Sequence, residues 1–106
     1  MSKLKIDSQN FENEVINSEI PVMVDFWADW CMPCHMLDPV IEEIANEFEG
    51  KIKVGGLNVD ENGDLSSKYS IMSIPAVLFF KDGKEVSRLI GVRGKEDFTA
   101  EIDKIT

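Results

Sequence analysis

The stretch VMVDFWADWCMPCHMLDPVIEEIANEF, residues 22–48, decides the fold. Pro21 to Ala28 is nearly all apolar, which is typical of a central strand that helices cover on both faces. From Pro33 to Phe48 the apolar residues recur with the period of a helix. They are Leu37, Val40, Ile41, Ile44, Ala45 and Phe48. Pro39 lies inside this helix and predicts a kink, and Gly50 is a plausible stop.

The rest of the chain alternates strands and helices in the same way. We expect a short edge strand at Leu4 to Ile6 and a helix that Ser8 caps and that runs to about Asn17. The further expected elements are strand Ile52 to Val59, helix Asn62 to Tyr69, strand Ala76 to Phe80, a tight turn at Asp82-Gly83, strand Glu85 to Ile90 and helix Lys95 to about Ile105. The order βαβαβαββα predicts an α/β fold with a mixed sheet between helices.

The totals limit the classes of function. The chain has 106 residues and shows no linker or repeat, so we expect a single domain over residues 1–106. Its net charge of −9 argues against nucleic acid as a partner and against binding to anionic lipid. No segment is apolar enough to span a membrane, and Met1 to Asp7 holds no signal-peptide core. We therefore expect a cytoplasmic protein that uses its acidity for solubility.

Cys31 and Cys34, the only cysteines, lie where the apolar strand gives way to the helix. At a helix N-terminus, free N–H groups and the helix dipole lower the pKa of a thiol, so that Cys31 is a candidate nucleophile. Pro33 suits the first turn, where its missing N–H costs nothing. Cys34 lies one turn further on and can form a disulfide with Cys31. We expect Cys34 to be the more buried thiol, which resolves the mixed disulfide that Cys31 forms.

Three other interpretations of the cysteine pair remain. A structural disulfide across such a short loop contributes only roughly 2 kcal/mol. A zinc site needs four ligands, and the one further soft donor, His35, is badly placed beside Cys34. Two inert core thiols would not explain the proline or the helix start. The pattern therefore favours a redox-active dithiol and no metal.

The stretch from Val24 to Cys34 closely resembles the signature of the thioredoxin family. The resemblance continues, in order, through Asn58-Val59-Asp60, Tyr69, Ile74-Pro75, Phe80-Lys81-Asp82-Gly83 and Gly91, and covers essentially the whole chain. It implies a central mixed five-stranded sheet flanked by four helices. It also implies a monomeric protein-disulfide reductase and electron carrier in cell redox homeostasis, recycled by a thioredoxin reductase. No cofactor is then bound, because the electrons reside on Cys31 and Cys34.

Asp25 is the one charged residue in the apolar strand. Burial raises the pKa of a carboxyl group, unless Asp25 lies at the strand end and reaches water. The resemblance implies that Asp25 lies below the dithiol and assists proton transfer at Cys34. For Pro75, sequence alone favours a trans bond, because only about 5–6% of X–Pro bonds in folded proteins are cis. The resemblance instead implies a cis-Pro75 beside the dithiol, where the backbone pairs with an extended substrate.

The expected substrate-binding surface surrounds Cys31. Its residues are Trp30, Met32, Pro33, Ile74, Gly91 and Val92. An exposed apolar patch on a small protein often marks a docking site, although each residue alone can be an ordinary surface hydrophobe. Gly91 would let a substrate backbone approach, or it is simply a strand-end glycine. Trp27 is expected to pack beneath the site, and Met23, Phe26, Val77 and Phe79 to belong to the core.

The sequence departs from the family pattern near the dithiol. Met32 replaces the usual glycine, and we expect it to alter the redox potential and the substrate choice. Gly56 replaces a common lysine near Asp25, so we expect burial of Asp25 to be less opposed and its pKa to lie well above normal. His35 replaces another lysine and is either a pH-dependent charge or a solvated helix residue. Asp38 either favours the helix dipole or raises the thiol pKa.

Two other functions compete with a general disulfide reductase. An oxidant or isomerase can use the same fold, but the Trp-Cys-x-Pro-Cys pattern and the missing signal peptide favour the reductase. A binding module held by a partner protein would keep its activity after loss of both cysteines.

Overall fold

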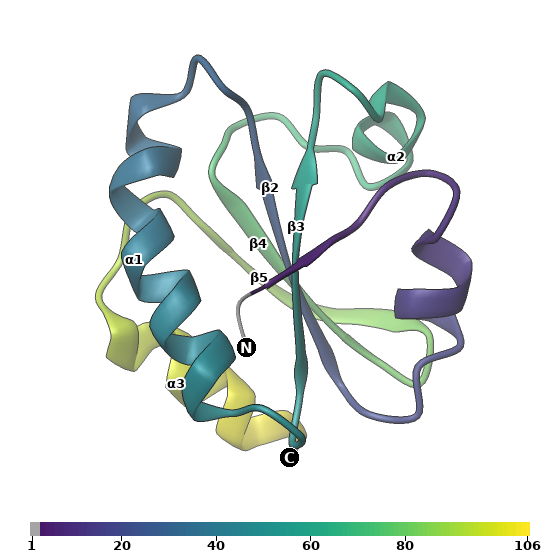
Figure 1. The fold of residues 1–106 in the computed structure, drawn as a ribbon, viewed down its shortest axis with the longest axis vertical. Coiled ribbons are helices and arrows are strands. Elements are labelled where there is room, and N and C mark those ends of the chain that lie inside the picture. Colours follow the sequence, from purple (N-terminus) through teal and green to yellow (C-terminus); the bar gives the residue numbers. More distant parts are fainter. Residues whose placement is uncertain (1–2) are drawn as a thin grey trace.

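The structure is a computed structural model that describes residues 3–106. The elements follow one another in the predicted order, shown in Figure 1. They are β1 (Leu4–Lys5), the π-helix η1 (Glu12–Ile16), β2 (Val22–Trp27), α1 (Met32–Glu47), β3 (Lys53–Asn58), α2 (Gly63–Lys68), β4 (Ala76–Lys81), β5 (Lys84–Ile90) and α3 (Lys95–Ile105). In this part of the chain no helix is long and apolar enough to cross a membrane.

The described strands form one five-stranded sheet in the order β1-β3-β2-β4-β5. β1 and β2 both pair in parallel with β3, whereas β4 runs antiparallel to β2 and β5. This confirms the predicted mixed sheet, with the N-terminal strand at its edge. The central strand is β2, in agreement with its nearly continuous apolar sequence.

Helices cover both faces of the sheet (Figure 1). On one face α1 and α3 bury Leu37, Ile41, Phe98 and Ile102 against strand residues such as Phe79. On the other face η1 and α2 pack over a second apolar cluster. The expected core residues Met23, Phe26, Val77 and Phe79 are all fully buried. The helical stripe of α1 is confirmed, although Val40 and Phe48 at its margins are only half-buried.

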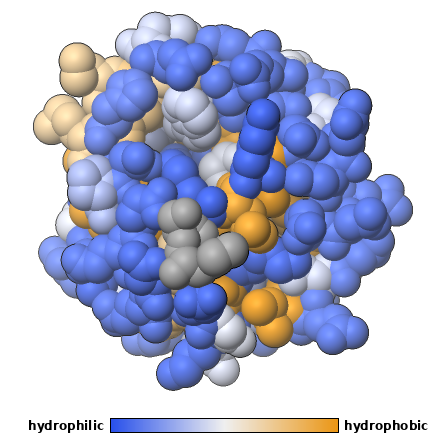
Figure 2. Space-filling model, in the orientation of Figure 1, coloured by the Kyte–Doolittle hydropathy of each residue, from blue (hydrophilic) through white to orange (hydrophobic). Residues whose placement is uncertain are grey.

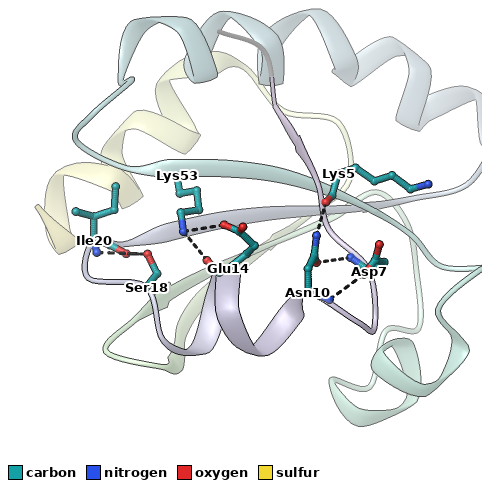
Figure 3. Close-up of polar contacts among 7 residues, drawn as sticks. All are labelled: Lys5, Asp7, Asn10, Glu14, Ser18, Ile20 and Lys53. Atoms are coloured by element: carbon teal, nitrogen blue, oxygen red, sulfur yellow. Dashed lines mark hydrogen bonds and ion pairs between the residues drawn. The ribbon is translucent and has the colours of Figure 1, made fainter.

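The first helix differs from its prediction. It spans only Glu12–Ile16, and Ser8 does not cap it. The carboxylate of Asp7 instead accepts the backbone N–H groups of Gln9 and Asn10. The Asn10 side chain in turn accepts the N–H of Asp7, and Figure 3 shows the contacts between Asp7 and Asn10. Ser8 is thereby free to donate its hydroxyl to Asp64, near the start of α2. Asp7 satisfies the free N–H groups of this turn, as a cap residue does.

A lysine from the sheet holds η1 in place. The Lys53 ammonium at the start of β3 donates to the backbone oxygen of Glu14 at 3.0 Å and to its carboxylate at 3.1 Å (Figure 3). The Glu14 side chain is largely exposed, so the ion pair itself contributes little, and the bond from half-buried Lys53 to the backbone oxygen of Glu14 is what ties the helix to the sheet. A five-residue helix is too short to be stable by itself, so such tertiary contacts are what hold it.

The predicted tight turn joins β4 to β5. Asp82 and Gly83 both have positive φ, 54° and 79° respectively, as a two-residue hairpin turn requires. Gly83 is also crowded, because a Cβ atom there would lie 2.9 Å from the backbone oxygen of Ile16. The turn therefore depends on glycine at this position for two independent reasons.

We predict that Gly83→Ala lowers the free energy of unfolding by about 1–2 kcal/mol, the cost of a left-handed conformation for an L-residue, plus the cost of the close backbone contact. Urea unfolding of the oxidised protein measures it. Gly63→Ala is the matched control, because a Cβ atom at Gly63 meets nothing within 4 Å and its φ is not positive. Equal stability of the two variants would contradict this account of the turn.

Candidate functional site

The dithiol lies at the N-terminus of α1, as predicted. Cys31 is the N-cap residue, and its Sγ accepts the backbone N–H of Cys34 at 3.2 Å. The two cysteines form a disulfide, and their Cα atoms are 5.3 Å apart. When the disulfide is reduced, the same N–H and the helix dipole favour a thiolate on Cys31 over one elsewhere. Pro33 occupies the first turn of the helix, where no donor is lost.

The burial of the two cysteines differs from the expectation. Cys34 was expected to be the more buried residue, but in the disulfide form each is 3% exposed. Both pack with Ala28 and against Trp27, Val59 and Ile74. The two sulfurs are joined in this form, so the same surroundings shield both. The packing of Trp27 against the pair agrees with its expected place beneath the site.

The Ile74-Pro75 segment lies opposite the disulfide. Its peptide bond is cis, as the resemblance implied and contrary to the expectation from sequence alone. The Ile74 carbonyl oxygen is 3.8 Å from Cys31 Sγ. Pro75 is buried and its own carbonyl accepts the backbone N–H of Gly91 at 2.9 Å. This contact brings Gly91 and Val92 to the same end of the sheet as the dithiol.

Apolar side chains surround the dithiol on the surface. Trp30, Met32 and Val92 are 70%, 68% and 47% exposed, while Ile74 is half-buried. Figure 2 shows apolar surface at the upper left, the end of the molecule where α1 begins in Figure 1. The expected substrate-binding residues therefore lie together. Met36 and Met72 are also exposed, at 64% and 91%, and were not predicted.

Trp30 is held in place despite its exposure. Its indole Nε1 donates to the Asp60 carboxylate at 2.8 Å. Asp60 belongs to the Asn58-Val59-Asp60 motif, but no local pattern in the sequence pairs it with Trp30. Trp30 also borders a hollow of about 490 Å³ whose other lining residues are Val59, Ser66, Ile71, Met72, Ser73 and Ile74. A side chain of a docked protein would find apolar walls there.

Asp25 lies beneath the site and is 1% exposed. Within residues 3–106 neither of its carboxylate oxygens accepts a hydrogen bond. Burial raises the pKa of Asp25 from 3.8 to about 6, and the negative charge of Asp38 adds to the rise. The direction agrees with the sequence-based hypothesis, and its main cause is desolvation. Asp25 does not reach water at a strand end.

A cation does face Asp25, although Gly56 stands where the family commonly has a lysine. Gly56 indeed lies beside Asp25 in the register of β2 and β3. However, the Lys3 ammonium approaches Asp25 Oδ2 to 3.7 Å and lowers the pKa that burial raises. Lys3 also forms an ion pair with Asp38 on α1. The sequence contained a signal for this contact, namely a bare Gly56 beside Asp25 and a lysine directly before the predicted edge strand.

His35 and Asp38 take different positions along α1. His35 is exposed, and its Nε2 lies 2.8 Å from the backbone oxygen of Asp29. The solvated interpretation therefore describes His35 better. Asp38 acts on Asp25 and Lys3, a role that neither of the two sequence-based alternatives included. Within residues 3–106 no group of three His, Cys, Asp or Glu side chains could hold a metal ion.

We predict that Asp25→Asn changes the pH dependence of stability. The folded pKa of about 6 exceeds the ordinary 3.8, so the folded state binds more protons and loses stability as the pH rises from about 4 through 6. The variant should therefore gain stability relative to the parent between pH 4 and pH 8. A rise of about two units corresponds to roughly 3 kcal/mol.

Urea unfolding of the oxidised protein at pH 4, 6 and 8 measures this gain. Asp103→Asn makes the same carboxylate-to-amide change at an exposed position and should show no such gain. If the stability difference between Asp25→Asn and the parent were constant over this range, Asp25 would not carry a raised pKa.

Comparisons with known proteins agree with the fold and the site. The thioredoxin family model matches residues 2–104. A thioredoxin of Rickettsia bellii is 49% identical over 90 residues, which cover 85% of this chain and 86% of the relative. Thioredoxin 1 of Nostoc is 44% identical over 94% of both chains, and a thioredoxin of Pyropia yezoensis is 43% identical over 98% of this chain and 97% of the relative.

The family works through a redox-active disulfide and normally acts with thioredoxin reductase and disulfide-containing substrates. This chain has the disulfide at the expected helix start. The chain therefore belongs to the thioredoxin family, and with its Cys31–Cys34 disulfide it is a thiol–disulfide oxidoreductase.

Proposed function

We propose that the protein reduces disulfide bonds of other proteins, with Cys31 as the nucleophile and Cys34 as the resolving thiol. The contact between the Cys34 amide and Cys31 Sγ at the start of α1 carries this assignment. It gives Cys31 a hydrogen-bond donor that stabilises a thiolate, whereas no donor to the Cys34 sulfur is found among residues 3–106.

The reaction has two exchange steps. The Cys31 thiolate attacks one sulfur of the substrate disulfide, and the other substrate sulfur leaves as a thiolate and takes up a proton. Cys34 then loses its proton and attacks Cys31 Sγ, which breaks the mixed disulfide and releases the second substrate thiolate. Two electrons pass from the dithiol to the substrate, and Cys31 and Cys34 end as a disulfide.

Asp25 is the proposed proton acceptor for Cys34. Both residues line one cavity of about 300 Å³ under the disulfide, so that the carboxyl group and the resolving thiol border the same space. A carboxyl group with a pKa of about 6 is mainly ionised at neutral pH yet basic enough to accept a proton. This balance supports the role better than a normal, fully acidic Asp would.

The substrate is proposed to bind as an extended segment beside Ile74 and cis-Pro75. The Ile74 carbonyl near Cys31 Sγ supports this site, because backbone groups near the sulfur can pair with an extended chain. Trp30, Met32, Pro33, Gly91 and Val92 would contact the substrate around it. Their exposed apolar surface would be covered in the complex.

We infer that residues 1–106 act as one thioredoxin domain, as a monomer, and that a thioredoxin reductase recycles the disulfide. No bound cofactor is needed, because the exchange chemistry uses only sulfur. A cytoplasmic location suits a chain whose only two cysteines form the redox pair, since reducing compartments favour catalytic over structural disulfides.

We predict that Cys34→Ser accumulates a mixed disulfide with a protein substrate such as insulin, because Cys31 can attack but nothing resolves the product. Non-reducing electrophoresis and mass spectrometry detect the adduct at Cys31. Cys31→Ser, the matched variant, should form no adduct, and both should reduce insulin at the background rate. An adduct mainly on Cys34 would reverse the two roles, and full insulin reduction by both variants would mean that the dithiol does not carry the reaction.

We predict that the Cys31–Cys34 pair is strongly reducing. The reduction potential of the pair should lie closer to about −270 mV, the reference value for thioredoxin, than to about −180 mV, the value for protein disulfide isomerase. Thiol labelling after equilibration in dithiol redox buffers measures it. Met32→Gly, which restores the usual family residue, shows how far Met32 shifts the potential. A markedly oxidising parent protein would instead indicate an oxidase or isomerase.

A further inference from the structure

Lys3 directly precedes β1, the edge strand next to β3, and its side chain reaches the site from there. Its ammonium lies 3.7 Å from Asp25 Oδ2 on β2 and forms an ion pair with Asp38 on α1. The Lys3 side chain is only 18% exposed, and its ammonium is 5.8 Å from the centre of the Trp27 ring. This cation is therefore held between β2 and α1 and is partly shielded from water.

Gly56 makes room for Lys3. In the parallel register of β1 and β3, Lys5 is the partner of Gly56, and the side chain of Lys3, two residues earlier, extends over Gly56. A Cβ atom at Gly56 would lie 3.2 Å from Lys3 Cε and 3.3 Å from Lys3 Cδ. The aliphatic part of Lys3 thus occupies the space that a side chain at position 56 would need. Gly56 is also the direct neighbour of Asp25 in the sheet, which explains how Lys3 reaches that carboxylate.

The cavity under the disulfide joins these groups to Cys34. Its lining residues are Lys3, Asp25, Trp27, Asp29, Cys34, His35 and Asp38. The charged or titratable groups that face it therefore come from the N-terminal segment, from β2, from the loop after β2 and from α1. Lys3 and Asp38 are ion-paired, and His35 lies near the backbone oxygen of Asp29. Among these groups Lys3 is the permanent cation nearest to Asp25.

We propose that Lys3 is a positioning residue for the resolving step: its ammonium, held by Asp38, keeps Asp25 ionised so that Asp25 can accept the proton of Cys34. The inference rests on the proposed role of Asp25. Lys3 itself neither gives nor takes a proton. The proton moves from Cys34 Sγ to the Asp25 carboxylate, the Cys31–Cys34 bond forms, and the bond from Cys31 to the substrate breaks.

The charges around Asp25 set the direction of the effect. Burial raises the pKa of Asp25 most strongly, Lys3 lowers it, and the negative charge of Asp38 raises it. Without Lys3, burial and Asp38 would act unopposed. Asp25 would then stay protonated at higher pH, where it has no free site for the proton of Cys34.

The test compares Lys3→Met with the parent protein in two measurements. Carboxyl NMR of the oxidised protein gives the titration midpoint of Asp25, and stopped-flow reduction of insulin gives the pH profile of the resolving step. We expect Lys3→Met to raise the midpoint by about one unit or more, as is typical for loss of an opposite charge at this distance. The resolving rate at pH 6 should then fall about fivefold, and its pH profile should shift upward by the same amount.

Two further variants separate charge from packing. Lys3→Arg retains the cation and should keep the midpoint near that of the parent. Lys5→Met removes a neighbouring lysine that is exposed and does not line the cavity, so it should change neither measurement. A shift in Lys5→Met as large as that in Lys3→Met would mean that overall charge, and not the position of Lys3, sets the titration.

A rescue variant tests the geometry directly. In Lys3→Ala the space over Gly56 holds neither the ammonium nor the aliphatic chain of Lys3, and Gly56→Lys in that background would supply an ammonium from the strand beside Asp25. We expect the double variant to bring the midpoint and the pH profile back toward those of the parent. If Lys3 only anchored the N-terminal segment, a lysine on β3 would restore neither.

Asp25→Asn distinguishes an error in the proposed role of Asp25 from an error in the proposed role of Lys3. If Asp25→Asn leaves the resolving rate and its pH profile unchanged, the proposed role of Asp25 is wrong, and that of Lys3 with it. If Asp25→Asn slows the step but Lys3→Met leaves the Asp25 midpoint in place, Asp25 keeps its role and only the assignment of Lys3 is overturned.

Discussion

Strand β2 is hydrogen-bonded along both of its edges, in parallel to β3 and antiparallel to β4. Its backbone polar groups are thereby satisfied, so the strand can be buried on both faces. The chain that leaves β2 runs directly into the dithiol and α1. The antiparallel pairing sets Phe26 beside Ala76, which brings the Ile74-Pro75 segment to the same end of the sheet. The redox pair and its neighbouring backbone meet because of this double pairing.

The same burial makes Asp25 the most constrained ionisable group of the site. Burying a carboxylate that accepts no hydrogen bond costs free energy. The pKa of Asp25 is therefore raised, and the nearby Lys3 ammonium partly compensates its charge. Asp38 has two opposite effects, since it holds Lys3 in place and also repels the charge on Asp25. The balance of these charges couples the N-terminal segment, β2 and α1 to the chemistry at Cys34.

Much of the fold was predictable because its signals are local. The apolar run of β2, the helical period of α1 and the Asp82-Gly83 turn each depend on residues close together in the chain. The first helix shows where local signals fail. Asp7 and Ser8 are both acceptable cap residues, and the contact of Ser8 with Asp64 in α2 separates their roles. No local pattern could have chosen between them.

The features of the candidate site also fall into two groups, those that local sequence sets and those that contacts between distant residues set. The sequence by itself determined the position of the dithiol at a helix start, the apolar rim around Cys31 and the anomaly of one Asp in an apolar strand. These features follow from spacing, period and residue type, which neighbouring residues set. Only the tertiary structure decided that Lys3 passes over Gly56 to Asp25, that Asp60 holds Trp30, and that the Ile74 carbonyl faces Cys31. These contacts join residues far apart in the chain, and strand pairing brings them together.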